Sequence, residues 1–169
     1  KTNAEVAAET AGWVHRLVPA DRTKFTALHA AFRTGGTFLH VPRDTAIQLP
    51  IQTFTYLDAD GAAVFPHTLV VVEAGSEVTF IDRYASTDLR RAFSDAVTEI
   101  HVGDGAHVRY VSIQEWGSGV THLGIQRSTV DSSAVRPQAT RDSIGRMVES
   151  FFADPGRVRI SVTAIRAMA

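Results

Sequence analysis

The sequence predicts a mainly β protein, a parallel β-helix (β-solenoid) in which coils of about 30 residues stack on one another. The first observation is a short phrase that recurs four times, starting at Val41, Val72, Val102 and Val130. These valines lie 31, 30 and 28 residues apart (72−41, 102−72 and 130−102). In each copy the valine ends a strand-like run, and a turn of small or polar residues follows. In the first three copies a β-branched residue then starts the next strand.

The second observation is a series of strand-like segments between residues 37 and 134. They are rich in Val, Ile, Thr and aromatic residues, and they cover residues 37–41, 52–56, 68–72, 78–81, 98–102, 108–113 and 121–126. The third observation is that turn-forming residues separate them, at 42–44, 58–61, 74–75, 103–105 and 117–119. Two or three short strands per period fit one coil, whose apolar inner face must be covered by its neighbours.

Two short helices are expected before the β segment. Residues 4–17 predict a helix that ends at Pro19 and has one apolar face, formed by Val6, Trp13, Val14 and Leu17. A second amphipathic helix should stop at Gly35-Gly36. Its apolar face is expected to consist of Phe25, Leu28, Ala31 and Phe32.

The pattern changes again after residue 134. Residues 140–153 predict a helix with an apolar stripe formed by Ile144, Met147, Val148, Phe151 and Phe152. The tail, residues 158–164, alternates like a half-buried strand. We therefore divide the chain into an N-terminal helical segment (1–34), a β-helix core (35–135) and a C-terminal helix and tail (136–169).

The composition is that of an ordinary globular domain, with 169 residues, 44% hydrophobic residues and a net charge of −1. This charge offers no electrostatic case for binding nucleic acid or an anionic membrane, and we expect neither partner. The chain has no cysteine, which excludes disulfides and thiolate-ligated clusters on these residues. No signal peptide is visible, so we expect a cytoplasmic protein.

Several separated phrases resemble the core domain of the SufB/SufD family, in the same order and at similar spacing. They cover roughly residues 20–134, and they are residues 25–32, 35–42, 49–51, 66–82, 96–100, 106–110 and 112–116. The family belongs to the SUF system of iron–sulfur cluster assembly. The resemblance implies a right-handed parallel β-helix, in agreement with the repeat. It also implies that the members pair with each other and with SufC, an ATPase.

The resemblance is closer to SufD than to SufB. The phrase at residues 65–73 is SufD-like, and a chain without cysteine suits the subunit that does not carry cluster thiolates. Residues 114–116 nevertheless have a counterpart in SufB. Residues 146–152 resemble the C-terminal helix that docks on SufC, which implies that Met147, Val148, Phe151 and Phe152 bind this partner. In a lone domain the same stripe would pack on the core instead.

The chain departs from the family after Ala134, where family members continue through many more coils. Arg136 stands where a β-branched residue should start the next strand. We therefore expect a SufD-like protein that lacks much of the β-helix core. A solenoid with so few coils should expose an unpaired β edge. Either a second copy or SufB should cover this edge, giving a dimer, or residues 137–169 should cover it.

Seven histidines raise the question of a metal site. Glu99 and His101 share a strand face and His107 follows after a turn, so these three could bind a metal if the two strands paired in a suitable register. His67, which follows Pro66, is expected to have a structural or surface role. The most economical interpretation makes all four ordinary residues and predicts no metal, cofactor-binding or catalytic residue.

Other chemical motifs are weak. Residues 117–119 (Gly-Ser-Gly) lack the spacing of a hydrolase nucleophile turn, and residues 103–105 (Gly-Asp-Gly) lack the Lys-Ser/Thr of a phosphate loop. Parallel β-helices also include polysaccharide lyases and hydrolases, which need clustered acidic or basic groups. Asp82, Arg83 and Asp131 are the available candidates, and they are scattered.

The sequence therefore predicts a non-enzymatic scaffold subunit of the SUF complex that binds SufB and SufC and carries no cofactor itself. Two alternatives remain open. One is a β-helix enzyme acting on carbohydrate, and the other is a solenoid interaction module without SUF activity.

Overall fold

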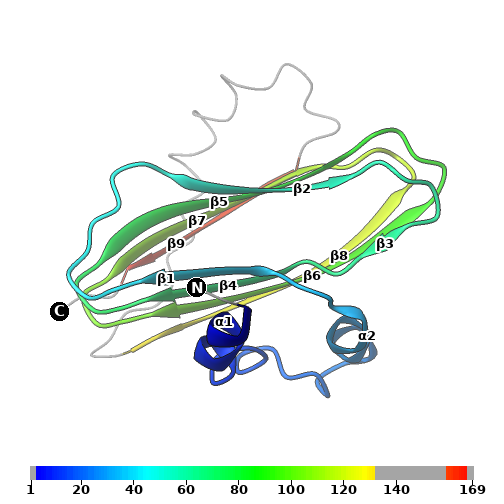
Figure 1. The fold of residues 1–169 in the computed structure, drawn as a ribbon. Coiled ribbons are helices and arrows are strands. Elements are labelled where there is room, and N and C mark those ends of the chain that lie inside the picture. The colour runs from blue at the N-terminus through cyan, green and yellow to red at the C-terminus, as the bar shows by residue number, and fades with distance from the viewer. Residues whose placement is uncertain (1–2, 132–158, 167–169) are drawn as a thin grey trace.

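The computed structural model describes residues 3–131 and 159–166 of the chain. Two sheets face each other along the molecule, and the chain passes from one to the other at both ends (Figure 1). The predicted C-terminal helix, with Met147, Val148, Phe151 and Phe152, lies outside the described residues, and so does Arg136.

The first sheet, here sheet A, consists of parallel strands that come from successive coils. They are β1 (Thr37–Val41), β4 (His67–Val72), β6 (Ala92–Val102), β8 (Val120–Val130) and the short β3 (Ala63–Val64). In sheet B, the strands β2 (Ile51–Leu57), β5 (Glu77–Ser86) and β7 (His107–Glu115) stack in parallel in the same way, and β9 (Arg159–Arg166) joins the edge of β7. The parallel pairing of strands about 30 residues apart confirms the predicted β-helix.

The recurring phrase marks one corner of the solenoid. Its valines stack in register, since Val41 pairs with Val72, Val72 with Val102, and Val102 with Val130. The third residue after the valine has a left-handed backbone in each of the first three copies: φ is 56° at Asp44, 70° at Gly75 and 67° at Gly105. Gly and Asp tolerate this conformation, so the phrase encodes the backbone turn as well as the polarity of the corner.

The solenoid interior is apolar at this corner and polar further along. Stacked aliphatic and aromatic residues fill the apolar part, namely Val41, Val70, Val72, Val78, Phe80, Ile100, Val102, Ala106, Val108 and Tyr110. Beyond them lies the buried carboxylate of Asp82, which is 2% exposed. It accepts hydrogen bonds from the hydroxyls of Thr53, Thr68, Tyr84 and Tyr110, at 2.8, 2.8, 2.8 and 2.9 Å.

The N-terminal segment packs on the outer face of sheet A (Figure 1). Its first helix, α1 (Asn3–Thr10), is shorter than the helix predicted over residues 4–17. The backbone turns after Thr10, and His15 has a φ of 60°. The predicted length was wrong because the backbone N–H groups of residues 15, 17 and 18 donate to the Glu99 carboxylate. In a continuing helix they would have donated to carbonyl groups of the helix itself.

The second helix, α2 (Lys24–Phe32), forms where predicted, but it buries a different face. Thr26 and His29 are buried, whereas Phe25 is 37% and Phe32 60% exposed. Thr26 belongs to a capping box with Thr23, and the His29 ring hydrogen-bonds to sheet A. Specific polar contacts thus decide the orientation of this short helix over the apolar stripe.

The last coil differs between the two sheets. In sheet B the tail strand β9 pairs with β7 in antiparallel orientation, which confirms the alternating tail as a strand and covers this edge. In sheet A, β8 pairs with β6, and no strand among the described residues pairs with the other edge of β8.

Candidate functional site

Three histidines and a glutamate meet beneath the N-terminal segment. Glu99 projects from β6 and His67 from β4, while His29 comes from α2 and His15 from the loop after α1. Glu99 and His29 are 0% exposed and His67 is 3% exposed. We call these four residues the His–Glu cluster.

The cluster is a continuous chain of hydrogen bonds. The His29 Nδ1 lies 2.9 Å from the carbonyl oxygen of Asp95, and its Nε2 lies 3.1 Å from the His67 Nδ1. The His67 Nε2 lies 3.0 Å from the Glu99 Oε1. The Glu99 carboxylate also accepts the backbone N–H groups of His15 (2.6 Å), Leu17 (2.6 Å) and Val18 (3.1 Å). Sheet A therefore holds the N-terminal segment through one carboxylate and one imidazole pair.

Burial and hydrogen bonding set the protonation states of His29 and Glu99, which lie at the two ends of this series of hydrogen bonds. It lowers the pKa of His29 to about 4, despite the opposing hydrogen bond to the Asp95 carbonyl, so this ring is neutral at pH 7. Burial opposes ionisation of Glu99, but the hydrogen bonds from His67 and the three backbone N–H groups outweigh it and hold the pKa of Glu99 below its usual value. Glu99 is therefore a carboxylate.

Hydrogen-bond directions then determine the protonation of His67. A carbonyl oxygen only accepts, so the single proton of neutral His29 lies on Nδ1 and its Nε2 accepts from the His67 Nδ1–H. The Glu99 carboxylate also only accepts, so the His67 Nε2 donates to it. His67 thus carries two protons and forms a buried ion pair with Glu99.

The His15 ring completes the cluster. Its Nδ1 lies 3.2 Å from the carbonyl oxygen of Val18, and its ring stands edge-on to that of His67, with centroids 5.1 Å apart. Within the described part of the chain, one group of three or more side chains has the spacing of metal ligands: His15, His67 and Glu99, whose donor atoms all lie within 4.8 Å of one another.

This arrangement corrects the cluster that the sequence allowed. Glu99 is part of it, but His107 lies in sheet B, opposite Glu77 in the strand register, and is not a member of the cluster. His101 packs against Trp13 instead, with ring centroids 4.6 Å apart. His67, expected to be structural or on the surface, is buried beside Glu99. Sequence reasoning missed His15 and His29 because both lay within predicted helices.

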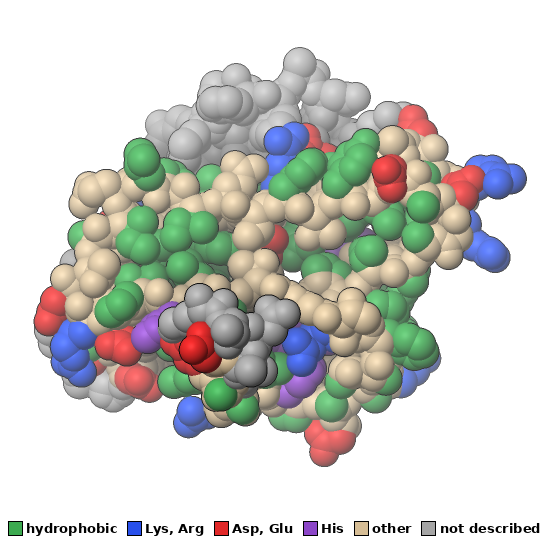
Figure 2. Space-filling model, in the orientation of Figure 1, with side chains coloured by type: hydrophobic (Ala, Val, Ile, Leu, Met, Phe, Trp, Pro, Cys, Tyr) green, Lys and Arg blue, Asp and Glu red, His purple; other side chains and the backbone are tan. Residues whose placement is uncertain are grey.

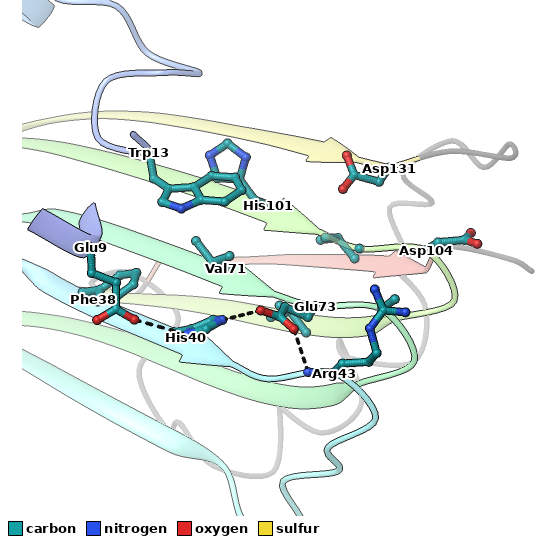
Figure 3. Close-up of a pocket in the computed structure, with 14 residues that line it drawn as sticks. Glu9, Trp13, Phe38, His40, Arg43, Val71, Glu73, His101, Asp104 and Asp131 are labelled. Carbon is teal, nitrogen blue, oxygen red and sulfur yellow. Dashed lines mark hydrogen bonds and ion pairs between the residues drawn. The ribbon is translucent and has the colours of Figure 1, made fainter. Parts of the chain in front are cut away.

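A groove of about 370 Å³ runs beside the cluster, between the N-terminal segment and the corner of the solenoid (Figure 3). His40 lies between two carboxylates there, 3.4 Å from Glu9 and 2.9 Å from Glu73. Glu73 also accepts the backbone N–H of Arg43. Trp13 and His101 form the opposite wall. The groove combines an aromatic wall with an acidic rim.

The remaining chemical candidates do not assemble into a site. Asp82 lies inside the solenoid, Arg83 pairs with Glu115, and Asp131 lies at the groove beside His101. Residues 117–119 form a packing turn: a side chain on Gly119 would meet the Leu89 carbonyl oxygen of the adjacent coil at 1.8 Å. Residues 103–105 are the corner turn of the third coil.

The visible surface carries mixed charge. On the face shown in Figure 2, acidic and basic side chains are interspersed and neither sign forms a continuous patch. In the part of the chain that the structure describes, every helix is too short or too polar to cross a bilayer.

The fold and the site together define a class: a parallel β-solenoid with a helical segment latched onto one face. Comparison with known proteins gives the family. Residues 54–146 match the family model of the SUF system FeS cluster assembly SufBD core domain, and the chain belongs to this family.

Individual relatives agree with this assignment. The iron–sulfur cluster assembly protein SufD of Bacillus subtilis is 38% identical over 105 residues, which cover 62% of this chain and 24% of that protein. SufBD family proteins of Staphylococcus saprophyticus and Staphylococcus aureus are 33% and 34% identical, over 68% of this chain and 25% of each relative. The chain is thus SufD-like and spans about a quarter of the length of these relatives.

Proposed function

We propose that this chain is a non-enzymatic, SufD-like scaffold subunit of the SUF complex that pairs with SufB, or with a second copy, and with the SufC ATPase. The observation that carries the proposal is the match of residues 54–146 to the SufBD core, whose described part, residues 54–131, lies in the stacked coils of the solenoid. We also propose a cytoplasmic location, as expected from the sequence.

The last coil supports pairing through the solenoid. The edge of β7 is covered by β9, whereas β8 has one partner strand, β6, among the described residues. An edge strand of 11 residues offers a row of backbone N–H and C=O groups to another chain. A neighbouring SufB or a second copy of this chain could add a strand there by β-augmentation, giving a dimer.

Binding to SufC would use the predicted apolar stripe of residues 140–153. A Phe151→Asp substitution places a charge in this stripe and should weaken binding by at least about 100-fold, because a buried unpaired charge costs several kcal/mol. Ser150→Asp adds the same charge off the stripe and is the matched control. Binding is measured by titrating purified SufC with each variant in calorimetry.

Equal binding by both variants would contradict the role of the stripe, and no binding of SufC or SufB at micromolar concentrations would contradict the scaffold proposal. In that case the chain would be a solenoid interaction module outside the SUF complex. The carbohydrate alternative has no support in the geometry of the described residues. Asp82 is buried and accepts four hydroxyl donors, whereas Arg83 pairs with Glu115 and Asp131 lies at the groove.

A further inference from the structure

We propose that His15, His67 and Glu99 form a binding site for one divalent first-row transition metal, such as zinc. The three residues come from three separate parts of the chain, and their donor atoms already lie within 4.8 Å of one another. Two imidazoles and one carboxylate are a donor set that zinc and ferrous iron both accept. This inference does not depend on whether the chain binds SufB or SufC.

Each ligand is already oriented by a second partner, as in established metal sites. The Nδ1 of His15 hydrogen-bonds to the Val18 carbonyl, which leaves Nε2 as the ring nitrogen available to a metal. The His67 Nδ1 is held by His29, which in turn is anchored on the Asp95 carbonyl. The Glu99 carboxylate is fixed by three backbone N–H groups. Such a supporting shell is more than an isolated ion pair requires.

The distance between the donor atoms of two of the three ligands, His67 and Glu99, is close to that in a tetrahedral metal site. With metal–ligand bonds of about 2.0–2.1 Å, neighbouring donor atoms lie about 3.3 Å apart. The His67 Nε2 and the Glu99 Oε1 are separated by 3.0 Å. His15 must move inward, and it is the ligand best placed to do so because it lies on the half-buried loop after α1. The fourth position would be left to water.

Binding exchanges a proton for the metal. In the metal-free protein the His67 Nε2–H donates to Glu99. The metal takes the Nε2 lone pair, and the proton leaves to solvent. Glu99 exchanges its hydrogen bond from His67 for the metal and keeps those from the three backbone N–H groups. The charge of the site rises by one, because a dication enters and one proton departs.

The test is calorimetric titration of zinc into protein freed of metal by a chelator. We expect one equivalent to bind, with about one proton released per zinc at pH 7 as measured with buffers of different ionisation enthalpy. Bound Co²⁺ should show the visible absorption of a tetrahedral site. Under anaerobic conditions Fe²⁺ should bind the same site more weakly than zinc.

His15→Asn is the decisive variant. Asn tolerates the positive φ of this residue and keeps the backbone N–H that Glu99 accepts, so the fold should persist. It should weaken zinc binding by at least about 100-fold, more than the loss of a supporting partner. His107→Asn removes a histidine of sheet B and should leave binding unchanged. Circular dichroism checks that each variant is folded.

Three results would overturn the proposal: no zinc binding at micromolar concentrations, unchanged binding by a folded His15→Asn variant, or equal loss in His107→Asn. The first would make the cluster a structural ion pair that latches the N-terminal segment. The other two would place the zinc on surface histidines.

Discussion

Two buried carboxylates lie on opposite sides of sheet A, and they are held in different ways. Asp82, inside the solenoid, accepts hydrogen bonds from four hydroxyl groups of threonines and tyrosines. Glu99, on the outer face, accepts three backbone N–H groups and an imidazole. Asp82 ties stacked coils to each other, whereas Glu99 ties the N-terminal segment to the stack.

The difference between the donors decides what each site can do. Burial raises the pKa values of Tyr84 and Tyr110 far above the physiological range, so the hydroxyls around Asp82 keep their protons. Around Glu99 an imidazole supplies the proton, and imidazoles exchange protons and bind metals near pH 7. The inner carboxylate is therefore fixed and structural, while the outer one can respond to pH or to a metal.

The largest effect should come from removing the inner carboxylate. Asp82→Ala leaves three buried hydroxyls and the partly buried hydroxyl of Thr53 without their acceptor, and we expect the free energy of unfolding to fall by about 4 kcal/mol. Urea denaturation followed by circular dichroism measures this change. Asp60→Ala, which removes an exposed carboxylate paired with Arg90, should leave the transition almost unchanged. A loss for Asp82→Ala no larger than for this control would contradict the structural role of Asp82.

The second prediction concerns pH and the outer cluster. The pKa of His29 is lowered from 6.5 to about 4, so between these values the unfolded chain binds more protons than the folded one. The free energy of unfolding should keep its full value above pH 6.5 and should fall as the pH drops toward 4. His29 alone accounts for about 3 kcal/mol of this loss. Urea denaturation at pH 7.5 and pH 4.5 measures it.

Neighbouring groups also contribute to the dependence of stability on pH, and a variant separates their contribution from that of His29. Positive charge on Arg33, His15 and His67 helps to lower the pKa of His29. Burial also lowers the pKa of His15, so His15 likewise makes the folded state less stable as the pH falls. Burial raises the pKa of the Asp95 carboxyl, which acts in the opposite direction. His29→Gln should reduce the difference between the two pH values by most of the His29 contribution. An unchanged difference would show that His29 does not titrate in this way.

The solenoid could be predicted from the sequence, but the packing of the N-terminal segment on its outer face could not. Coil stacking repeats every 30 residues, so Val41, Val72, Val102 and Val130 each report the same corner, and the fold could be predicted from one chain. The packing of α1 and α2 occurs once. It depends on Glu99 reaching residues 15–18, across more than 80 positions of sequence, which no local pattern encodes.

The candidate site was predictable only in part, for a related reason. Strand alternation correctly put Glu99 and His101 on one face, but it could not show that this face lies under the N-terminal segment. A signal was nevertheless present: Asp95, Glu99 and His101 are polar residues on one face of a strand rich in apolar residues. Buried polar groups need partners, and the histidines outside the core were the residues available to supply them.

The smallest of the three effects should be local. Glu99→Gln keeps the shape of the side chain but replaces one accepting oxygen by a donating amide, which leaves part of the loop at residues 15–18 without an acceptor. We expect a loss of about 2 kcal/mol that is confined to the N-terminal segment. In hydrogen–deuterium exchange the amides of Leu17 and Val18 should lose protection, while those of β4 and β6 keep theirs. Glu73→Gln, an exposed outer-face carboxylate that also accepts a backbone N–H, is the control and should change neither. Loss of protection throughout the strands would mean that Glu99 supports the whole solenoid, as Asp82 does, and the distinction between the two carboxylates would fail.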